Sequence, residues 1–277
     1  MSITEFSWKT AENITIFSRE WKPESNTRAV IIIVHGLGEH SLRYEYTAKH
    51  FNNHGFAVIA FDLQGHGKSG GNRGYASFQQ SYIEIDRAIK EAKTRYPGMP
   101  VFLYGHSLGA SLVLIYAAQR KPMINGLIAS APCIRTASPI TPFKLAVGKS
   151  SSYLFPTLAL GNGLDRSGLS RDTSIVHAYI NDPLVHDRVT SKLGMDLVDS
   201  GFFLLQHAHE FTMPCLLMQG TADRIVDPDA TFEFASKAPS TTTFKKWDGL
   251  YHELHNEPEK DDVLKYVEDW IDKRINQ

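Results

Sequence analysis

The most informative segment of the chain is Val101-Phe-Leu-Tyr-Gly-His-Ser-Leu-Gly-Ala-Ser-Leu-Val-Leu114. Its first four residues are apolar strand formers, and the residues after Gly109 continue as a helical pattern. Between them lies Gly-x-Ser-x-Gly, with Ser107 at its centre. A strand, a sharp turn and a helix in this order are what a nucleophile elbow requires, because the turn holds the serine hydroxyl exposed at the strand end. The segment therefore predicts that Ser107 is a nucleophile.

A candidate for the carboxylate that orients the catalytic histidine follows Ser107 in the chain. A serine hydroxyl is a weak nucleophile until a histidine, itself oriented by a carboxylate, takes its proton. Residues 214–220 form an apolar, strand-like run, and Asp223 comes just past its end. Asp227 is a second acid, but it precedes Pro228, which is typical of a residue that caps a helix. The pattern favours Asp223, at the carboxyl end of a strand, where open α/β sheets place their sites.

A histidine comes next along the chain. Residues 242–247 read as another strand, and the loop after them carries His252 and His255. His252 comes first after the strand, which favours it as the general base. The two histidines are three residues apart, whereas the zinc motif His-Glu-x-x-His needs a spacing of four on a helix. The sequence therefore predicts a site of serine, aspartate and histidine, without a metal.

Backbone donors for an oxyanion are expected at the end of an earlier strand. Residues 28–34 are rich in β-branched side chains, and the glycine-containing loop 35–40 follows them. Its glycines let the backbone approach a ligand closely. We expect the N–H groups of Leu37 and Leu108 to converge on the oxyanion, where each such donor contributes about 3–4 kcal/mol in other enzymes.

Five motifs together resemble the monoacylglycerol lipase branch of the α/β-hydrolase family. They are HGLGEH at 35–40, FDLQGHGKSGG at 61–71, GHSLG at 105–109, GTADRIVD at 220–227 and YHELH at 251–255. The resemblance covers nearly the whole chain. It implies an α/β-hydrolase fold, in which helices flank a mostly parallel eight-stranded sheet and a cap is inserted. It also implies Ser107, Asp223 and His252 as the catalytic triad, with Leu37 and Leu108 as the oxyanion hole.

The resemblance further implies a polar pocket for the alcohol part of a substrate. Arg43, His106 and Tyr179 align with family positions that contact glycerol, and Glu39 lies beside them. The apolar run 153–160 is expected to line a tunnel for one acyl chain, because pockets for apolar ligands are lined mostly by apolar side chains.

The alternation of predicted strands and helices divides the chain into a core and an inserted segment. Strands and helices alternate up to about residue 133, which predicts a parallel sheet covered on both faces. From Ile134 to His209 the alternation breaks, and proline, serine and glycine are interspersed with apolar patches. We therefore expect residues 1–133 and 210–277 to form the core and residues 134–209 to form a cap over the site.

Charge and hydropathy argue against several classes of protein. The 277 residues carry a formal net charge of −1, so charge gives no case for nucleic acid as a partner. The start of the chain lacks the basic and apolar segments of a signal peptide. No apolar run approaches the roughly 18–20 residues that cross a bilayer. We expect a soluble, cytoplasmic protein that acts on a lipid-like ester, with transient contact between the cap and membranes or lipid surfaces.

One glycine-rich motif resembles a cofactor site without meeting its requirements. Residues 65–70 match the dinucleotide-binding pattern Gly-x-Gly-x-x-Gly and follow a predicted strand. However, residues 71–76 intervene before the next helix begins at Ser77, so no helix N-terminus is available for a pyrophosphate. The proposed ester chemistry needs no organic cofactor either, and none is expected.

Several functions remain open at this point. Hydrolysis of monoacylglycerols to a fatty acid and glycerol, through an acyl-enzyme, comes first. The same machinery would suit a lysophospholipase or a broad-specificity carboxylesterase. A peptidase or a haloperoxidase-like enzyme is less favoured, although amides pass through the same type of tetrahedral intermediate as esters. A non-catalytic binding protein is also less favoured, since such a protein would be expected to have lost part of the triad.

Overall fold

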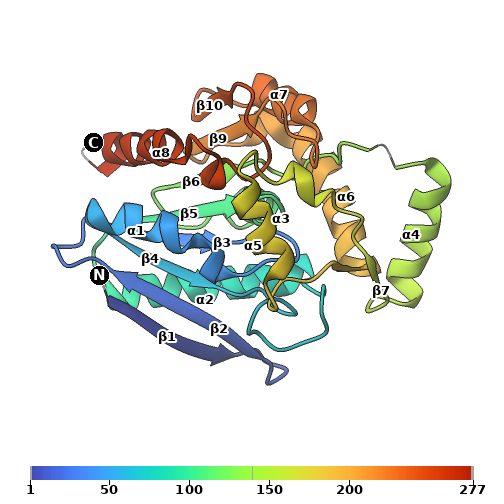
Figure 1. Cartoon of the computed structure of the whole chain (residues 1–277), viewed down its shortest axis with the longest axis horizontal. Coiled ribbons are helices and arrows are strands. Elements are labelled where there is room, and N and C mark those ends of the chain that lie inside the picture. The colour runs from blue at the N-terminus through green and yellow to red at the C-terminus, as the bar shows by residue number, and fades with distance from the viewer. Residues whose placement is uncertain (1, 139, 276–277) are drawn as a thin grey trace.

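A sheet of eight strands forms the centre of the computed structural model, which describes residues 2–138 and 140–275 (Figure 1). The strands lie in the order β1, β2, β4, β3, β5, β6, β9, β10. Their bounds are β1 (Ser2–Lys9), β2 (Thr15–Lys22), β3 (Ala29–Val34), β4 (Phe56–Phe61), β5 (Val101–His106), β6 (Gly126–Ser130), β9 (Cys215–Gly220) and β10 (Thr242–Trp247). The pairs β1–β2 and β2–β4 are antiparallel, and the other pairs are parallel. This arrangement confirms the predicted mostly parallel eight-stranded sheet.

Two apolar cores lie on opposite faces of this sheet. The helices that cover it are α2 (Phe78–Arg95), α3 (Leu108–Arg120) and α7 (Pro228–Lys237) on one face, and α1 (Glu45–Asn53) and α8 (Lys260–Ile275) on the other. Every residue of β3 is buried. Val30 and Ile32 belong to the first core, and Ile31 and Ile33 belong to the second. Successive strand residues point to opposite faces, so an unbroken β-branched run suits a strand that is covered on both sides.

The chain leaves the sheet between β6 and β9. This inserted segment contains α4 (Pro142–Leu154), β7 (Ala159–Gly161), α5 (Thr173–Asn181), β8 (Arg188–Thr190) and α6 (Ser191–His207). Leu193 and Leu204 of α6 join the core formed by α2, α3 and α7. Helix α4 packs on α6 and lies at the end of the molecule farthest from α8 (Figure 1). Across the described residues, no helix is both long and apolar enough to span a membrane.

The apolar run from Tyr153 to Leu160 lies on the surface. Tyr153 is 87% exposed and Leu158 is 47% exposed, and no residue of α4 is buried. The expectation that this run lines an acyl tunnel is therefore wrong. The physical reason is that α4 packs on α6 at the edge of the molecule, so that most of its apolar side chains meet solvent rather than the sheet.

Glycines make the turn at the end of β5 possible. Ser107 joins β5 to α3 with a φ of +53°, a backbone conformation that costs most residues on the order of 1–3 kcal/mol. A Cβ atom on Gly105 would collide with the Gly109 carbonyl, and a Cβ atom on Gly109 would collide with the Val34 carbonyl. Helix α3 therefore starts directly against the ends of β3 and β5.

Replacing Gly109 with alanine should destabilise the protein, because the added methyl group meets backbone that cannot move aside. We expect the free energy of unfolding to fall by at least about 2–3 kcal/mol in urea denaturation. Gly161→Ala is the matched control, since a Cβ atom there has no neighbour within 4 Å. The control should change stability by less than about 0.5 kcal/mol. Equal effects of the two substitutions would contradict this account of the turn.

Candidate active site

Ser107 lies where two strand ends meet. It follows β5 directly and is partly exposed. A Cβ atom built on Gly36 would lie 3.3 Å from the Cβ atom of Ser107 and 3.3 Å from Cδ2 of His106. The loop after β3 therefore passes directly beside the turn that carries the serine.

A hydrogen bond joins Asp223 and His252. His252 Nδ1 lies 2.8 Å from Asp223 Oδ2, and both side chains are almost completely buried. Asp223 follows β9 and His252 follows β10, so the parallel pairing of these strands brings the two loops together. Because Nδ1 is bonded to the carboxylate, Nε2 is the ring nitrogen that remains for another group. The His252 ring lies 4.8 Å from the ring of His106, which immediately precedes Ser107.

Further donors fix the Asp223 carboxylate. Its Oδ1 accepts from the N–H groups of Ile225 (2.8 Å) and Val226 (3.1 Å), and its Oδ2 accepts from Gln219 Nε2 (2.9 Å). Burial raises the pKa of Asp223, but His252 and these backbone donors outweigh burial and hold the pKa below its ordinary value. Burial lowers the pKa of His252, but the Asp223 carboxylate outweighs it and raises the pKa. The pair is therefore oriented, and the histidine is a stronger base than in water.

Asp227 and His255, the neighbouring candidates, make other contacts. Asp227 caps α7 and accepts from the N–H of Asp229 at 2.9 Å, as Pro228 at the first helical position predicts. His255 is fully buried, and its ring stacks on Tyr44 with 4.7 Å between centroids. Among the described residues, neither is hydrogen-bonded to the catalytic aspartate or histidine candidates.

Two backbone N–H groups flank Ser107. Leu108 is the first residue of α3, so its N–H has no acceptor within the helix. Within the described chain, the N–H of Leu37 takes part in no backbone hydrogen bond. The loop around Leu37 is nevertheless fixed, since the N–H of Gly36 donates to Glu39 Oε1 at 2.6 Å. Both groups therefore remain available to an acceptor that is bound at the serine.

The guanidinium group of Arg43 is buried between two carboxylates. It donates to both oxygens of Glu253, at 2.7 and 2.8 Å, and to Glu39 Oε2 at 2.5 Å. Burial lowers the pKa of Arg43, but Glu253 and Glu39 raise it well above its usual value, so the group stays charged. Glu39 belongs to the loop after β3, and Glu253 directly follows His252. The network therefore ties the loop of Leu37 to the loop of the histidine.

Helix α5 brings Tyr179 to this network. The Arg43 guanidinium lies 4.7 Å from the centre of the Tyr179 ring, and the tyrosine is buried. A Cβ atom on Gly38 would lie 3.4 Å from the Tyr179 hydroxyl. His40 Nε2 also lies 2.9 Å from Asp182 Oδ2, just after α5. The inserted segment is therefore held against the loop that follows β3.

The four residues expected to form the polar pocket lie close together but differ in their surroundings. Glu39 and Arg43 direct their charges at each other and at neighbouring protein groups. His106 is buried, with its ring beside that of His252. Burial, followed by the neighbouring His252, lowers the pKa of His106 to about 3, so its ring is neutral at neutral pH. Tyr179 lines a cavity of about 390 Å³.

Glu253 and Gln219 also belong to the site, although neither was expected from the sequence. Glu253 pairs with Arg43 and also accepts from Asn256 Nδ2 at 2.7 Å. A carboxylate directly after a candidate histidine was the available signal, because a carboxylate that is buried beside the histidine needs a cation. Gln219 donates to Asp223 and accepts from the Thr231 hydroxyl at 3.0 Å. A glutamine at the end of an apolar strand carries no comparable signal.

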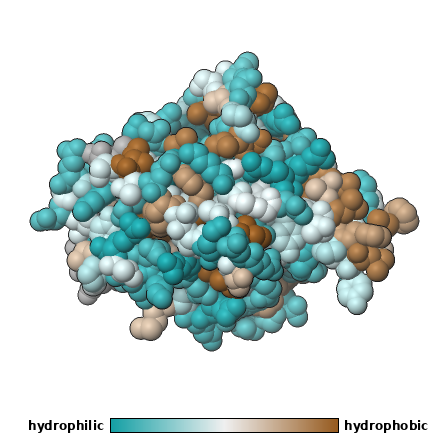
Figure 2. Space-filling view, turned by 90° about the horizontal axis from the view of Figure 1, so that it is seen from below, coloured by the Kyte–Doolittle hydropathy of each residue, from teal (hydrophilic) through white to brown (hydrophobic). Residues whose placement is uncertain are grey.

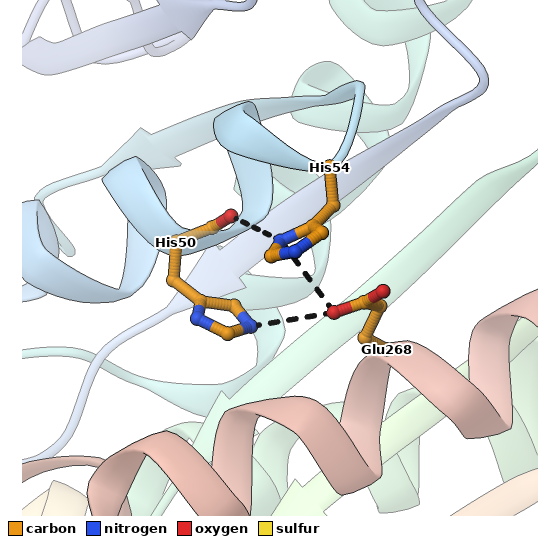
Figure 3. A group of neighbouring side chains, drawn as sticks. All are labelled: His50, His54 and Glu268. Atoms are coloured by element: carbon orange, nitrogen blue, oxygen red, sulfur yellow. Dashed lines mark hydrogen bonds and ion pairs between the residues drawn. The ribbon is translucent and has the colours of Figure 1, made fainter.

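One group of side chains that could hold a metal ion, among the described residues, lies between α1 and α8 (Figure 3). His50 Nε2 and His54 Nδ1 each lie 3.5 Å from Glu268 Oε2. His54 Nδ1 also lies 2.9 Å from the His50 carbonyl, to which it can donate. These contacts lie between the two helices, and the group takes no part in the contacts around Ser107.

The chain is similar to a known protein family and to several known proteins. A family model described as serine aminopeptidase, S33, matches residues 25–259. The chain is 35% identical to an uncharacterized abhydrolase domain-containing protein of Dictyostelium discoideum, over 96% of this chain and 28% of that protein. It is 34% identical to the monoglyceride lipase of Rattus norvegicus, over 96% of this chain and 89% of that protein.

A solved structure extends the similarity to three dimensions. The crystal structure of Paleococcus ferrophilus monoacylglycerol lipase superposes with a TM-score of 0.83 and 35% identity, and the match covers 98% of both chains. The similarity therefore includes the inserted segment as well as the sheet. The chain belongs to the serine aminopeptidase S33 family of α/β hydrolases, within the branch that contains the monoacylglycerol lipases.

Proposed function

We propose that this protein is a serine hydrolase that cleaves monoacylglycerols to a fatty acid and glycerol. The observation that carries the proposal is the buried hydrogen bond between His252 and Asp223, beside the turn that exposes Ser107. The names of the rat and Paleococcus ferrophilus relatives support the choice of monoacylglycerol as the substrate.

The proposed reaction has two steps. Ser107 Oγ attacks the ester carbonyl while His252 Nε2 takes its proton, and the N–H groups of Leu37 and Leu108 stabilise the oxyanion. The bond to the glycerol oxygen then breaks, and His252 gives that oxygen the proton. Water, deprotonated by His252, attacks the acyl carbon and releases the fatty acid. Asp223 holds the ring in the required tautomer and stabilises the imidazolium form.

We assign binding of the alcohol part of the ester to Tyr179 and His106, supported by Glu39 and Arg43. The Tyr179 hydroxyl lies beside Gly38, which belongs to the loop of the oxyanion donors, and the ring of His106, the residue before Ser107, lies 4.8 Å from that of His252. Because Arg43 and Glu39 are engaged with each other, their part in this proposal is to hold Tyr179 and the loop in place. A direct contact with the substrate is proposed only for Tyr179 and His106.

We propose that residues 134–209 act as the cap and residues 1–133 and 210–277 as the core. In support, the carbonyls of Gly168 and Leu169 accept from the N–H groups of His252 and Glu253, at 3.4 and 2.8 Å. These bonds place the inserted segment against the catalytic loops. Helix α6 belongs to both parts, since its inner face packs in the main core.

We also propose that the cap binds an anionic lipid surface, which would make the protein peripheral to membranes on their cytoplasmic side. Helix α4 exposes Phe143 (77%) and Tyr153 (87%), and its only charged residues are Lys144 and Lys149. Figure 2 shows apolar side chains gathered at the end of the molecule that α4 occupies in Figure 1. An apolar helix surface with basic residues suits the interface of a bilayer that contains acidic lipids.

Asp223→Asn should lower kcat/KM for an ester by about 10⁴-fold, because the histidine loses its orienting carboxylate. The substitution should also move the acidic limb of the pH–rate profile to lower pH. The base acts in its neutral form, and Asp223 raises the pKa of His252, so removing the carboxylate lowers the pH at which activity is lost. Asp227→Asn is the control and should leave both the rate and the profile nearly unchanged. Equal losses in the two variants would contradict the assignment.

Four compounds with the same acyl group separate the remaining functions: a 1-monoacylglycerol, a lysophosphatidylcholine, a triacylglycerol and a peptide amide. We expect the monoacylglycerol to be hydrolysed fastest and the amide slowest. Ser107→Ala should abolish hydrolysis of every compound, since no acyl-enzyme can form. Initial rates at matched concentrations decide the outcome. Faster turnover of the peptide amide would replace the lipase proposal with a peptidase, and equal rates for all three esters would indicate a broad carboxylesterase.

A double variant, Phe143→Ser with Tyr153→Ser, should bind vesicles of phosphatidylglycerol and phosphatidylcholine at least about tenfold more weakly. Burying a large apolar side chain contributes about 1.5–3 kcal/mol, so losing two such chains exceeds one tenfold step. Sedimentation with vesicles measures the binding. Ile83→Ser, which changes an exposed residue of α2, is the control. The lipid-surface proposal is wrong if both proteins sediment like the unmodified protein.

A further inference from the structure

A cavity with an excess of positive charge lies against the inserted segment. Its volume is about 390 Å³, within the range of sites for small molecules. Three arginines contribute to its lining, from three separate segments: Arg73 after β4, Arg166 before α5 and Arg188 in β8. Among the described residues that line it, Asp187 is the acidic one.

The carboxylate of Asp187 compensates for little of this charge. Its Oδ1 lies 3.6 Å from Arg188 Nε, and both side chains are 55% exposed, which is a weak pair in solvent. Arg73 donates to the Gly67 carbonyl at 2.8 Å. Within the described chain, the Arg166 guanidinium has no hydrogen bond or ion pair. Three arginines therefore line the cavity together with one exposed carboxylate.

The wall of this cavity reaches the proposed oxyanion loop. Tyr179 and His186 both line the cavity. The N–H of His186 donates to the Gly38 carbonyl at 2.9 Å, and the Tyr179 hydroxyl lies beside the same residue. Gly38 directly follows Leu37. The wall of the cavity therefore contacts the residue next to Leu37, and we take one end of an ester bound at Leu37 to reach the cavity along this wall.

The chemistry of the lining indicates which end enters. Ile180 and Val185 are the apolar residues of the lining, and the other six are polar or charged. An acyl chain requires mostly apolar surroundings, whereas arginines and a tyrosine hydroxyl suit a polar, anionic group. Guanidinium groups bind phosphate oxygens in pairs of charge-assisted hydrogen bonds, and a phosphate monoester carries about −1.5 to −2 charges at pH 7. The alcohol part of the ester is thus the part that fits here.

We propose that this arginine cavity binds the phosphate of an acylglycerol phosphate, so that the enzyme prefers a monoacylglycerol whose free alcohol end is phosphorylated. The inference rests on the proposed function and specifies its substrate class. The reaction is unchanged: water adds across the ester bond, and the products are a fatty acid and glycerol phosphate. Ser107 forms and loses the acyl bond, the glycerol oxygen takes the proton from His252, and the phosphate ester stays intact.

Direct binding can be measured without turnover. In the Ser107→Ala variant, isothermal titration with 1-octanoylglycerol 3-phosphate and with 1-octanoylglycerol compares the two head groups. We expect tighter binding of the phosphate ester, and a difference that shrinks as the salt concentration rises, because exposed charges are screened. Inorganic phosphate and glycerol 3-phosphate are titrated in parallel. If only the free phosphate binds, the cavity is an anion site that is unconnected with the substrate, and the proposal is wrong.

Turnover of the same two esters by the active enzyme gives the second test. We expect a higher kcat/KM for the phosphate ester. Arg166→Gln and Arg188→Gln should each lower the ratio of the two kcat/KM values about tenfold, the scale of a lost hydrogen bond to a charged group. Each variant serves as its own reference for folding, because the ratio compares two substrates on one protein. Arg87→Gln, on α2, is the control and should leave the ratio unchanged.

The outcomes separate this inference from the proposed function. If 1-octanoylglycerol is hydrolysed but the phosphate ester is not preferred, the proposed function stands and the inference is wrong. If the preference exists but survives both arginine substitutions, the cavity does not cause it, and the inference is again wrong. If neither ester is hydrolysed, the proposed function fails and the inference fails with it.

Discussion

The structure of the site depends on one buried cation. The Arg43 guanidinium lies between Glu39, in the loop of the proposed oxyanion donors, and Glu253, next to the proposed general base. The two carboxylates come from distant parts of the chain, and without the arginine their buried charges would lack a cation. Leaving a charge buried without its partner costs about 3–5 kcal/mol, so these two loops can adopt this arrangement only with the cation present. The ring of Tyr179 covers the same guanidinium, which extends the constraint to the inserted segment.

This network helps to explain how the site is assembled from five separate segments of the chain. They are residues 37–43, 106–108, 179, 223 and 252–253. The parallel strands bring their carboxyl ends to one edge, but strand ends alone leave the loops free to move. Hydrogen bonds from the inserted segment to Gly38, and from the histidine loop to Gly168 and Leu169, fix these loops against the inserted segment. The cavity that we assign to an anionic head group lies in the same contact region. In the function that we propose, substrate recognition and alignment of the catalytic groups therefore depend on the same set of contacts.

Much of this could be predicted from the sequence, because the decisive signals are local. The β-branched run in β3 and the glycines around Ser107 specify strand and turn through steric effects that act between near neighbours. Asp223 was separated from Asp227 by Pro228, which marks a helix start. The apolar run 153–160 misled the sequence analysis, because hydropathy does not say whether an apolar surface meets the core or solvent. The partnership of Arg43 with Glu253 could not be predicted either, since 210 positions separate them in the chain. The arginine cavity joins three segments in the same way, and only the folded chain brings them together.

In the mechanism that we propose, these loops hold two backbone donors and the histidine around Ser107. A crystal structure of the protein after reaction with a fluorophosphonate tests it most directly. The account predicts a single adduct on Ser107, with a phosphonyl oxygen about 2.7–3.1 Å from the N–H groups of both Leu37 and Leu108. It also predicts that the contacts of Arg43 with Glu39 and Glu253 are unchanged. An adduct on another residue, or an oxygen that points away from both N–H groups, would contradict the account.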